Sequence, residues 1–177
     1  MSRLTANHQF VAPSTEKGSI TVVNLEYSNL IYLQKLLDEG SCLIVMPFAV
    51  KNMYFIHLKN VIAPMPSTNE FKQAIKNGSN IIASPDIVAE GINYGAWDNV
   101  ILFECDLKVH QIHDSLNFTT MADRVLHKSI MGRINEMWNT YIIPQGNQIG
   151  QVHEAMRYYA DFQTKAMGQV TDFTYIN

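Results

Sequence analysis

The hydrophobic pattern switches between strand-like runs and helical periodicity several times near the start of the chain. The β-branched run 20–25 predicts a short strand. Leucines at helical spacing predict a helix over 29–39, which Gly40 ends. Two apolar runs follow, 42–50 and 53–62. Because only two polar residues separate these runs, we expect them to form an antiparallel hairpin.

Proline and capping residues mark the boundaries of the next elements. Pro47 lies inside the first of the two apolar runs, so this strand is expected at an edge of the sheet or beside a bulge. Ser67 and Glu70 have the spacing of a capping box, which predicts a helix over 68–76.

The stretch 80–108 is the unit against which the other elements can be placed. It predicts a short buried strand at 81–83, a helix that begins at Ser84 and ends at Gly95, and a longer strand at 100–107. The order of elements indicates a strand, a helix and a second strand packed into the core.

The last third of the chain is dominated by helical periodicity. One apolar face recurs from 119 to Tyr141, and a second helix is predicted from Ile149 to Met167. Because only a short turn that contains Pro144 separates these two predicted helices, we expect them to pack as an antiparallel pair. Tyr158 and Phe162 lie outside the main apolar face of the second helix, so we expect them on an interaction surface. The final residues fit a short strand.

Together these elements predict an α+β fold in a single domain that spans residues 1–177. Its sheet is expected to be mixed or antiparallel, with four to six strands and two short helices within 19–115. A C-terminal helical hairpin, 119–168, follows this core, and an N-terminal arm, 1–18, precedes it.

Composition favours a soluble protein that meets other proteins. Of the 177 residues, 47% are hydrophobic and only 16% are charged, which leaves more of the surface neutral or apolar. The net charge of −3 and the scattered basic residues make nucleic-acid binding an unfavoured expectation. No apolar run is long enough to span a membrane and no secretory signal is evident, so we expect a cytoplasmic protein. Cys42 and Cys105 lie in apolar runs and are expected to pack as free thiols.

Ionisable residues gather after the strand predicted at 100–107. They are Glu104, Cys105, Asp106, His110, His113 and Asp114. On a helical turn, two histidines spaced by three and one carboxylate could hold a divalent metal, as in a metal-dependent hydrolase. On a strand the two rings point to opposite faces, and the segment is then a solvated loop. The strand-like context favours the second interpretation, so we expect no metal.

No catalytic residue can be selected from the sequence. His57, His127 and His153 accompany no nucleophile motif, and the spacing of Gly91 and Gly95 is not that of a phosphate-binding loop. Aromatic residues near Gly95 fit either the floor of a nucleotide pocket or, more simply, the core.

One family resemblance can be given. The order of elements over residues 20–107, together with the segment SPDIVAEGINYG, resembles the ADP-ribosyltransferase fold, including its RNA 2′-phosphotransferase branch. The resemblance implies NAD as cofactor, with Ser84 and Tyr94 at the cofactor-binding positions. The family also places a His or Arg on its first strand and a catalytic Glu on a late strand, and neither is found here.

Two hypotheses about function follow. The one we prefer is a non-catalytic assembly or protein-interaction protein without a cofactor, such as a viral or phage accessory protein, whose partner is another protein or a second copy of the chain. The alternative is an ADP-ribosyltransferase-like enzyme that uses NAD to modify protein or nucleic acid.

Overall fold

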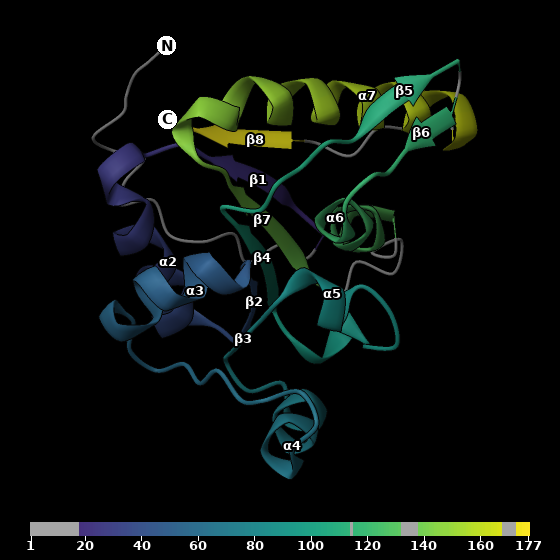
Figure 1. The fold of residues 1–177 in the computed structure, drawn as a ribbon. Helices are drawn as coiled ribbons and strands as arrows, with labels where there is room; N and C mark the ends of the chain where they lie inside the picture. The colour runs from purple at the N-terminus through teal and green to yellow at the C-terminus, as the bar shows by residue number, and fades with distance from the viewer. Residues whose placement is uncertain (1–17, 114, 132–137, 168–172) are drawn as a thin grey trace.

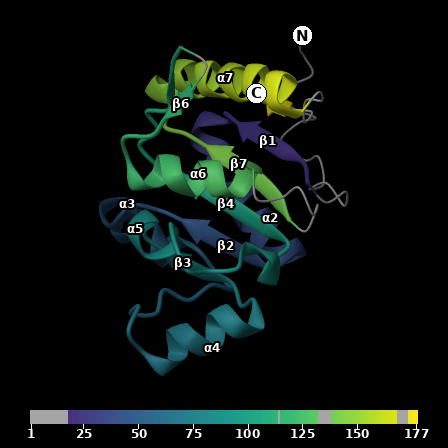
Figure 2. The same ribbon diagram turned by 90° about the vertical axis from the view of Figure 1, so that its right-hand side faces the viewer.

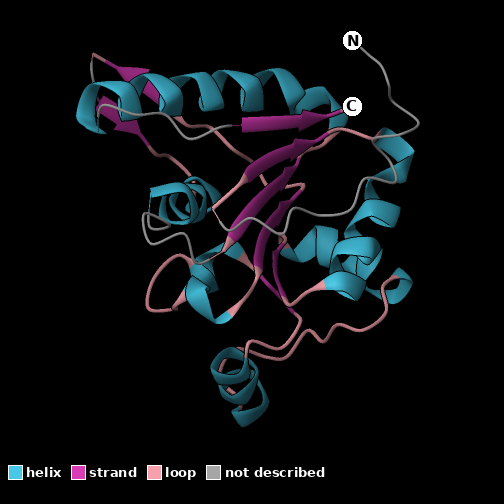
Figure 3. Cartoon of the chain, turned by 180° about the vertical axis from the view of Figure 1, so that it is seen from behind, coloured by secondary structure: helices cyan, strands magenta, loops and turns pink. Residues whose placement is uncertain are grey.

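The centre of the protein is a parallel sheet of six strands in the order β3-β2-β4-β7-β1-β8 (Figure 1). The computed structural model describes residues 18–113, 115–131, 138–167 and 173–177. The six strands are β1 (Ile20–Val23), β2 (Cys42–Val45), β3 (Ile81–Ala83), β4 (Asn99–Phe103), β7 (Asn139–Ile143) and β8 (Phe173–Ile176). Every pairing between them is parallel (Figure 3). The prediction of a mixed or antiparallel sheet is therefore wrong. The number of strands, six, is within the predicted range of four to six.

Burial on both faces explains why the central strands are parallel. Every residue of β2 and β4 is buried. Along β2 the side chains alternate, so that Leu43 and Val45 join one apolar layer while Cys42 and Ile44 join the other. Near-continuous apolar runs of this kind are typical of parallel sheets, because helices cover both of their faces.

Helices form a layer on each side of the sheet. They are α2 (Asn29–Glu39), α3 (Phe48–Tyr54), α4 (Asn69–Asn77), α5 (Pro85–Val88), α6 (Met121–Met131) and α7 (Ile149–Met167). Residues of α2 and α3 contribute to one apolar layer, and residues of α4, α5, α6 and α7 contribute to the other. Figure 1 shows α2 and α3 on one side of the strands and α5 and α6 on the other. Figure 2 shows α6 in front of the sheet and α4 beyond β3, at its edge.

Neighbouring strands send the chain to opposite faces at three places in the sheet, one of which is β2, which leads into α3, beside β3, which leads into α5. β1 leads into α2 and its neighbour β7 leads into α7, while β2 leads into α3 and its neighbour β4 leads towards α6. Such switch points leave a crevice outside the carboxyl ends of parallel strands, where ligands commonly bind. We call residues 24–28, 46–48, 104–106 and 144–148, which follow β1, β2, β4 and β7, the carboxyl-end rim.

Residues 48–57 are helical, whereas the sequence predicted the second strand of a hairpin. β2 ends at Val45, Pro47 is the N-cap of α3, and the chain continues through the 3-10 turn η2 (Phe55–His57). A proline fits this position because the first N–H groups of a helix have no partner within it. Within α3 only Val50 is buried. The predicted hairpin is wrong, and most apolar side chains of this segment face outward.

The prediction of a C-terminal helical hairpin is also wrong, because the central strand β7 separates the two helices in the chain. β7 pairs with β4 on one side and with β1 on the other. The expected helix from 119 to Tyr141 corresponds to α6, and residues 132–137 lie outside the described residues. The β-branched residues of β7 favour a strand, and they outweigh the helical spacing of its neighbours.

Several sequence predictions are confirmed. The helix at 29–39, the strand at 81–83, the helix at 149–167 and the short C-terminal strand are all present. The helix predicted at 68–76 is α4, but its N-cap is Thr68, whose hydroxyl accepts from the backbone N–H of Phe71. The segment of uncertain structure after β4 is a small antiparallel pair, β5 (His110–Ile112) and β6 (Ser115–Asn117).

The 3-10 turns η1 (Glu26–Ser28), η3 (Tyr94–Ala96) and η5 (Gly146–Gln148) complete the described elements. Among the described residues, no helix combines the length and apolar character that crossing a membrane requires. The arm expected at 1–18 lies outside the described residues, apart from Gly18.

Candidate functional site

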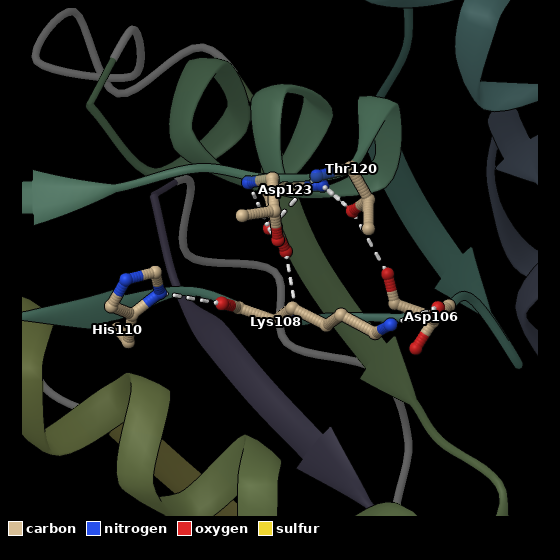
Figure 4. Close-up of polar contacts among 6 residues, drawn as sticks. Asp106, Lys108, His110, Thr120 and Asp123 are labelled. Carbon is tan, nitrogen blue, oxygen red and sulfur yellow. Dashed lines mark hydrogen bonds and ion pairs between the residues drawn. The ribbon is translucent and has the colours of Figure 1, made fainter.

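The ionisable cluster predicted after β4 is spread along an extended segment. Figure 4 shows Asp106 and His110 at opposite ends of it, with Lys108 between them. The ring of His110 donates from Nδ1 to the carbonyl oxygen of Lys108 at 3.2 Å, and the ammonium of Lys108 pairs with Asp106 at 3.6 Å. His113 lies in the turn after β5, with a backbone φ of 56°. Among the residues that the structure describes, which exclude Asp114, no three His, Cys, Asp or Glu side chains could hold a metal ion.

The polar centre of this region is Asp123, a carboxylate that the sequence did not single out. Its side chain is 0% exposed, and it accepts hydrogen bonds from the backbone N–H groups of Lys108 at 2.7 Å and Thr119 at 2.9 Å. It also accepts from the N–H of Thr120 at 3.2 Å, while the hydroxyl of Thr120 accepts from the N–H of Asp123 at 2.9 Å (Figure 4). This reciprocal pair is a capping box at the start of α6. All of these partners are backbone groups or neighbouring hydroxyls, so the arrangement is structural.

Ser84 and Tyr94, the cofactor-binding positions of the family resemblance, differ in their accessibility. Ser84 is the N-cap of α5 and is partly exposed. Tyr94 is only 1% exposed, and its hydroxyl donates to the carbonyl oxygen of Val88 at 2.7 Å. The edge of its ring meets Trp138, and the ammonium of Lys128 lies 4.3 Å from the ring centre. Tyr94 is therefore a core residue that offers no surface to a nicotinamide in this conformation.

Both cysteines are buried free thiols, as expected from the sequence. Burial raises the pKa of the Cys42 thiol to about 12, and burial also raises the pKa of the Cys105 thiol. Because the thiolate is the reactive form of cysteine, neither residue is suited to act as a nucleophile near neutral pH.

The interaction surface predicted on the last helix is described only in part. The ring of Tyr158 is partly exposed, its hydroxyl donates to the carboxylate of Glu154, and the guanidinium of Arg157 lies 5.6 Å from the ring centre. Phe162 lies on α7, but its side chain is outside the described residues. This surface stays a prediction.

Another set of exposed apolar side chains lies on α2, α3 and the adjoining turns η1 and η2. We call it the α2–α3 face, and it consists of the exposed side chains of Tyr27, Ile31, Phe48, Met53, Phe55 and Ile56. Ile56 is 83% exposed and Ile31 is 67% exposed. Several exposed apolar side chains on one layer of helices are a candidate interaction site.

A groove of about 460 Å³ runs along the same face. It lies between α2, which contributes Ile31, Gln34 and Asp38, and η2, which contributes His57. The side-chain amide of Gln34 holds the chain after η2 in place. It donates to the carbonyl oxygen of Lys59 at 3.0 Å and accepts from the N–H of Lys59 at 2.8 Å. These two hydrogen bonds link α2 to the chain that follows η2.

The carboxyl-end rim contains two residues in a backbone conformation that is unfavourable for side chains other than glycine. Glu26 after β1 and Glu104 after β4 both have a φ of 52°. Burial and the negative charge of the nearby Glu104 carboxylate raise the pKa of the Tyr54 hydroxyl. Backbone strain of this kind tends to occur at functional sites.

Two exposed aromatic rings belong both to the rim and to the α2–α3 face. Tyr27 is 97% exposed in η1, and Phe48 is exposed at the start of α3. The ammonium of Lys51 lies 4.7 Å from the centre of the Phe48 ring. Since β7 and β4 lie between β1 and β2, the strands that lead to the two residues are about 14 Å apart, at a spacing of about 4.8 Å between strands.

The α2–α3 face was not predicted, because the run 53–62, which contains Met53, Phe55 and Ile56, was expected to be a strand of a hairpin. A signal was available for Ile31, which lies off the apolar side of the helix at 29–39.

Neither a protein-family model nor a curated protein matches the sequence.

Proposed function

We propose that this protein acts by docking onto another protein through its α2–α3 face. The observation that carries the proposal is the set of exposed apolar side chains on this face, above all Ile31 and Ile56. Parallel α/β folds serve many functions, so the fold alone does not select this one. The exposed α2–α3 face is the feature that favours a docking function.

The energy available on this face suits a docking site. Burying one isoleucine side chain contributes about 1.5–3 kcal/mol. A few such anchors near the centre of an interface supply most of the binding energy in typical complexes. Ile31, Ile56 and Phe48 could together fill this role, while the charged residues around the groove would form the polar rim of the interface.

Affinity capture with matched variants tests the proposal. Ile31→Asp places a charge on the face, while Met121→Asp places the same charge on an exposed position at the start of α6, on the other side of the sheet. We expect both variants to keep the wild-type stability within about 0.5 kcal/mol. A protein captured by the wild type and by Met121→Asp, but lost with Ile31→Asp, supports the proposal. Equal capture by both variants would contradict it.

The NAD-dependent activity implied by the family resemblance stays a prediction of the sequence. Its test is the thermal unfolding midpoint with and without NAD. At a hundredfold excess over Kd, binding would stabilise the protein by about 2.7 kcal/mol, which is readily measured. An unchanged midpoint at millimolar NAD argues against this function.

The aromatic residues of the rim favour a second candidate function, although the net charge of −3 and the acidic rim residues Glu26, Glu104 and Asp106 oppose it. Exposed aromatic rings bind single-stranded nucleic acid by stacking on successive bases. Tyr27 and Phe48 follow strands that are about 14 Å apart, a separation that suits successive bases of a strand better than one mononucleotide. Lys51 beside Phe48 adds a positive charge for the backbone.

Fluorescence anisotropy with a labelled oligonucleotide tests this candidate. We expect binding of single-stranded DNA or RNA that weakens as salt is raised, and a tenfold or greater loss of affinity for Tyr27→Ala. A labelled mononucleotide is the control ligand. Binding that is unchanged in Tyr27→Ala contradicts a role for the rim.

A further inference from the structure

The α2–α3 face carries a projecting apolar side chain next to a recess. Ile56 projects from η2 with 83% of its side chain exposed. The next residue, His57, lines the groove together with Leu30 and Ile31 of α2. The face therefore has a projecting apolar side chain, Ile56, directly beside the groove.

A surface with both features can pair with itself. In a two-fold symmetric dimer the same patch is used by both subunits, so each knob enters the hole of the other copy. The groove volume of about 460 Å³ is within the range of pockets that hold drug-sized ligands, which leaves room for an isoleucine with its neighbouring atoms. The hydrogen bonds between Gln34 and Lys59 link α2, which lines the groove, to the chain that follows η2.

We propose that the α2–α3 face docks a second copy of this chain, with Ile56 of each copy seated in the groove of the other. The inference rests on the proposed function, since it names the partner for the same surface. The resulting dimer buries both copies of Ile31 and Ile56 near its two-fold axis.

Charge complementarity supports self-pairing. The groove has an acidic end at Asp38 and Glu39, and Glu39 pairs with Lys35 of its own helix at 3.7 Å. Lys59 is exposed three residues after Ile56. Asp38 accepts a hydrogen bond from the side-chain amide of Gln34 at 2.9 Å, and among the residues that the structure describes neither Asp38 nor Lys59 has an ion pair. In the dimer, Lys59 of one copy faces Asp38 of the other. Exposed pairs of this kind contribute little to affinity, but they fix the register of the two copies.

Sedimentation velocity of the full chain, from micromolar to submillimolar concentration, tests the dimer. We expect the wild type and Met121→Asp to reach the dimer mass at high concentration. Ile56→Asp should weaken the dimer at least tenfold, because the carboxylate would lose its hydration on burial and would meet the acidic side chains of Asp38 and Glu39 in the groove.

A charge-swap experiment distinguishes pairing between copies from pairing within one chain. Asp38→Lys alone and Lys59→Asp alone each place like charges opposite each other in a homodimer. Mixed together, the two variants form a heterodimer in which both contacts are attractive. We expect the mixture to associate about tenfold more tightly than either variant by itself.

Three results overturn the proposal: a wild-type monomer at every concentration, a dimer unaffected by Ile56→Asp, or a mixture no tighter than the separate variants. The proposed function can survive these results. If the chain is monomeric but captures a different protein through Ile31, then docking stands and self-pairing fails.

Discussion

Replacing Asp123 by alanine tests the polar link that joins α6 to the segment after β4. The buried carboxylate accepts from three backbone N–H groups, those of Lys108, Thr119 and Thr120. Leaving a buried donor without a partner costs about 1–3 kcal/mol. Lys108 and Thr119 are exposed residues, so water can reach part of the vacated space and the lower end of this range applies. We expect Asp123→Ala to lower the free energy of unfolding by about 3–5 kcal/mol in total.

Urea denaturation followed by circular dichroism measures this loss, with an unchanged m-value as the sign that both states keep their compactness. Asp86→Ala is the matched control, because Asp86 is exposed in the first turn of α5 and contributes about 0.3–1 kcal/mol through the helix dipole. A loss below about 1 kcal/mol for Asp123→Ala would refute the reasoning, since it would mean that the three N–H groups find other partners at little cost.

Three further predictions concern backbone conformation, pH and thiol reactivity. Gly78 has a φ of 64°, and a Cβ there would lie 2.0 Å from a carbonyl oxygen, so Gly78→Ala should cost about 2–4 kcal/mol in urea denaturation. Gly91 has a φ of 78° with nothing within 4 Å, so Gly91→Ala should cost only about 1–2 kcal/mol, and equal losses would contradict the steric argument. Burial lowers the pKa of His127 from the ordinary 6.5, so the unfolded chain binds the proton first and stability is lost as the pH falls below about 6.5. Unfolding measured against pH should show a smaller acid loss for His127→Gln, and identical profiles would exclude this role. Because burial raises the pKa of both Cys42 and Cys105, neither thiol should react with iodoacetamide at neutral pH until the chain unfolds, and rapid labelling of the native protein, measured by mass spectrometry, would contradict their burial.

Local elements could be predicted where the determining interactions are short in range. The helix α2 follows from its leucine spacing and its terminal glycine, and α4 follows from a capping residue and a run of helix formers. The strand β3 follows from three apolar residues just before a Ser-Pro helix start. In each case the signal lies within a few residues of the element.

The direction of the sheet could not be predicted, because it depends on partners far apart in the chain. β1 pairs with β7, whose residues lie more than a hundred positions further along. The sequence around β7 contained helix-spaced apolar residues on both sides, and these concealed the strand. The continuous burial of β4 is the feature that favours a parallel sheet, and an apolar run of that kind is visible in the sequence.

The location of the α2–α3 face could not be predicted, because a strand was expected where the chain forms α3 and η2. On the strand predicted over 53–62, Met53 and Phe55 would lie on one face of the sheet and their neighbours on the other. On α3 and η2 the same side chains lie on the outer side of the helical layer, where they are exposed. The expectation of a protein-interaction surface thus comes from composition, whereas its location comes from the fold.

The most direct test of the account is hydrogen exchange of the backbone amides at low and at high protein concentration. The account predicts that protection increases with concentration in α2, α3 and η2, around Ile31 and Ile56, while exchange in α6 and α7 is unchanged. Protection that increases instead over α6 and α7, or that does not change anywhere, would contradict the claim that the α2–α3 face docks a second copy of the chain.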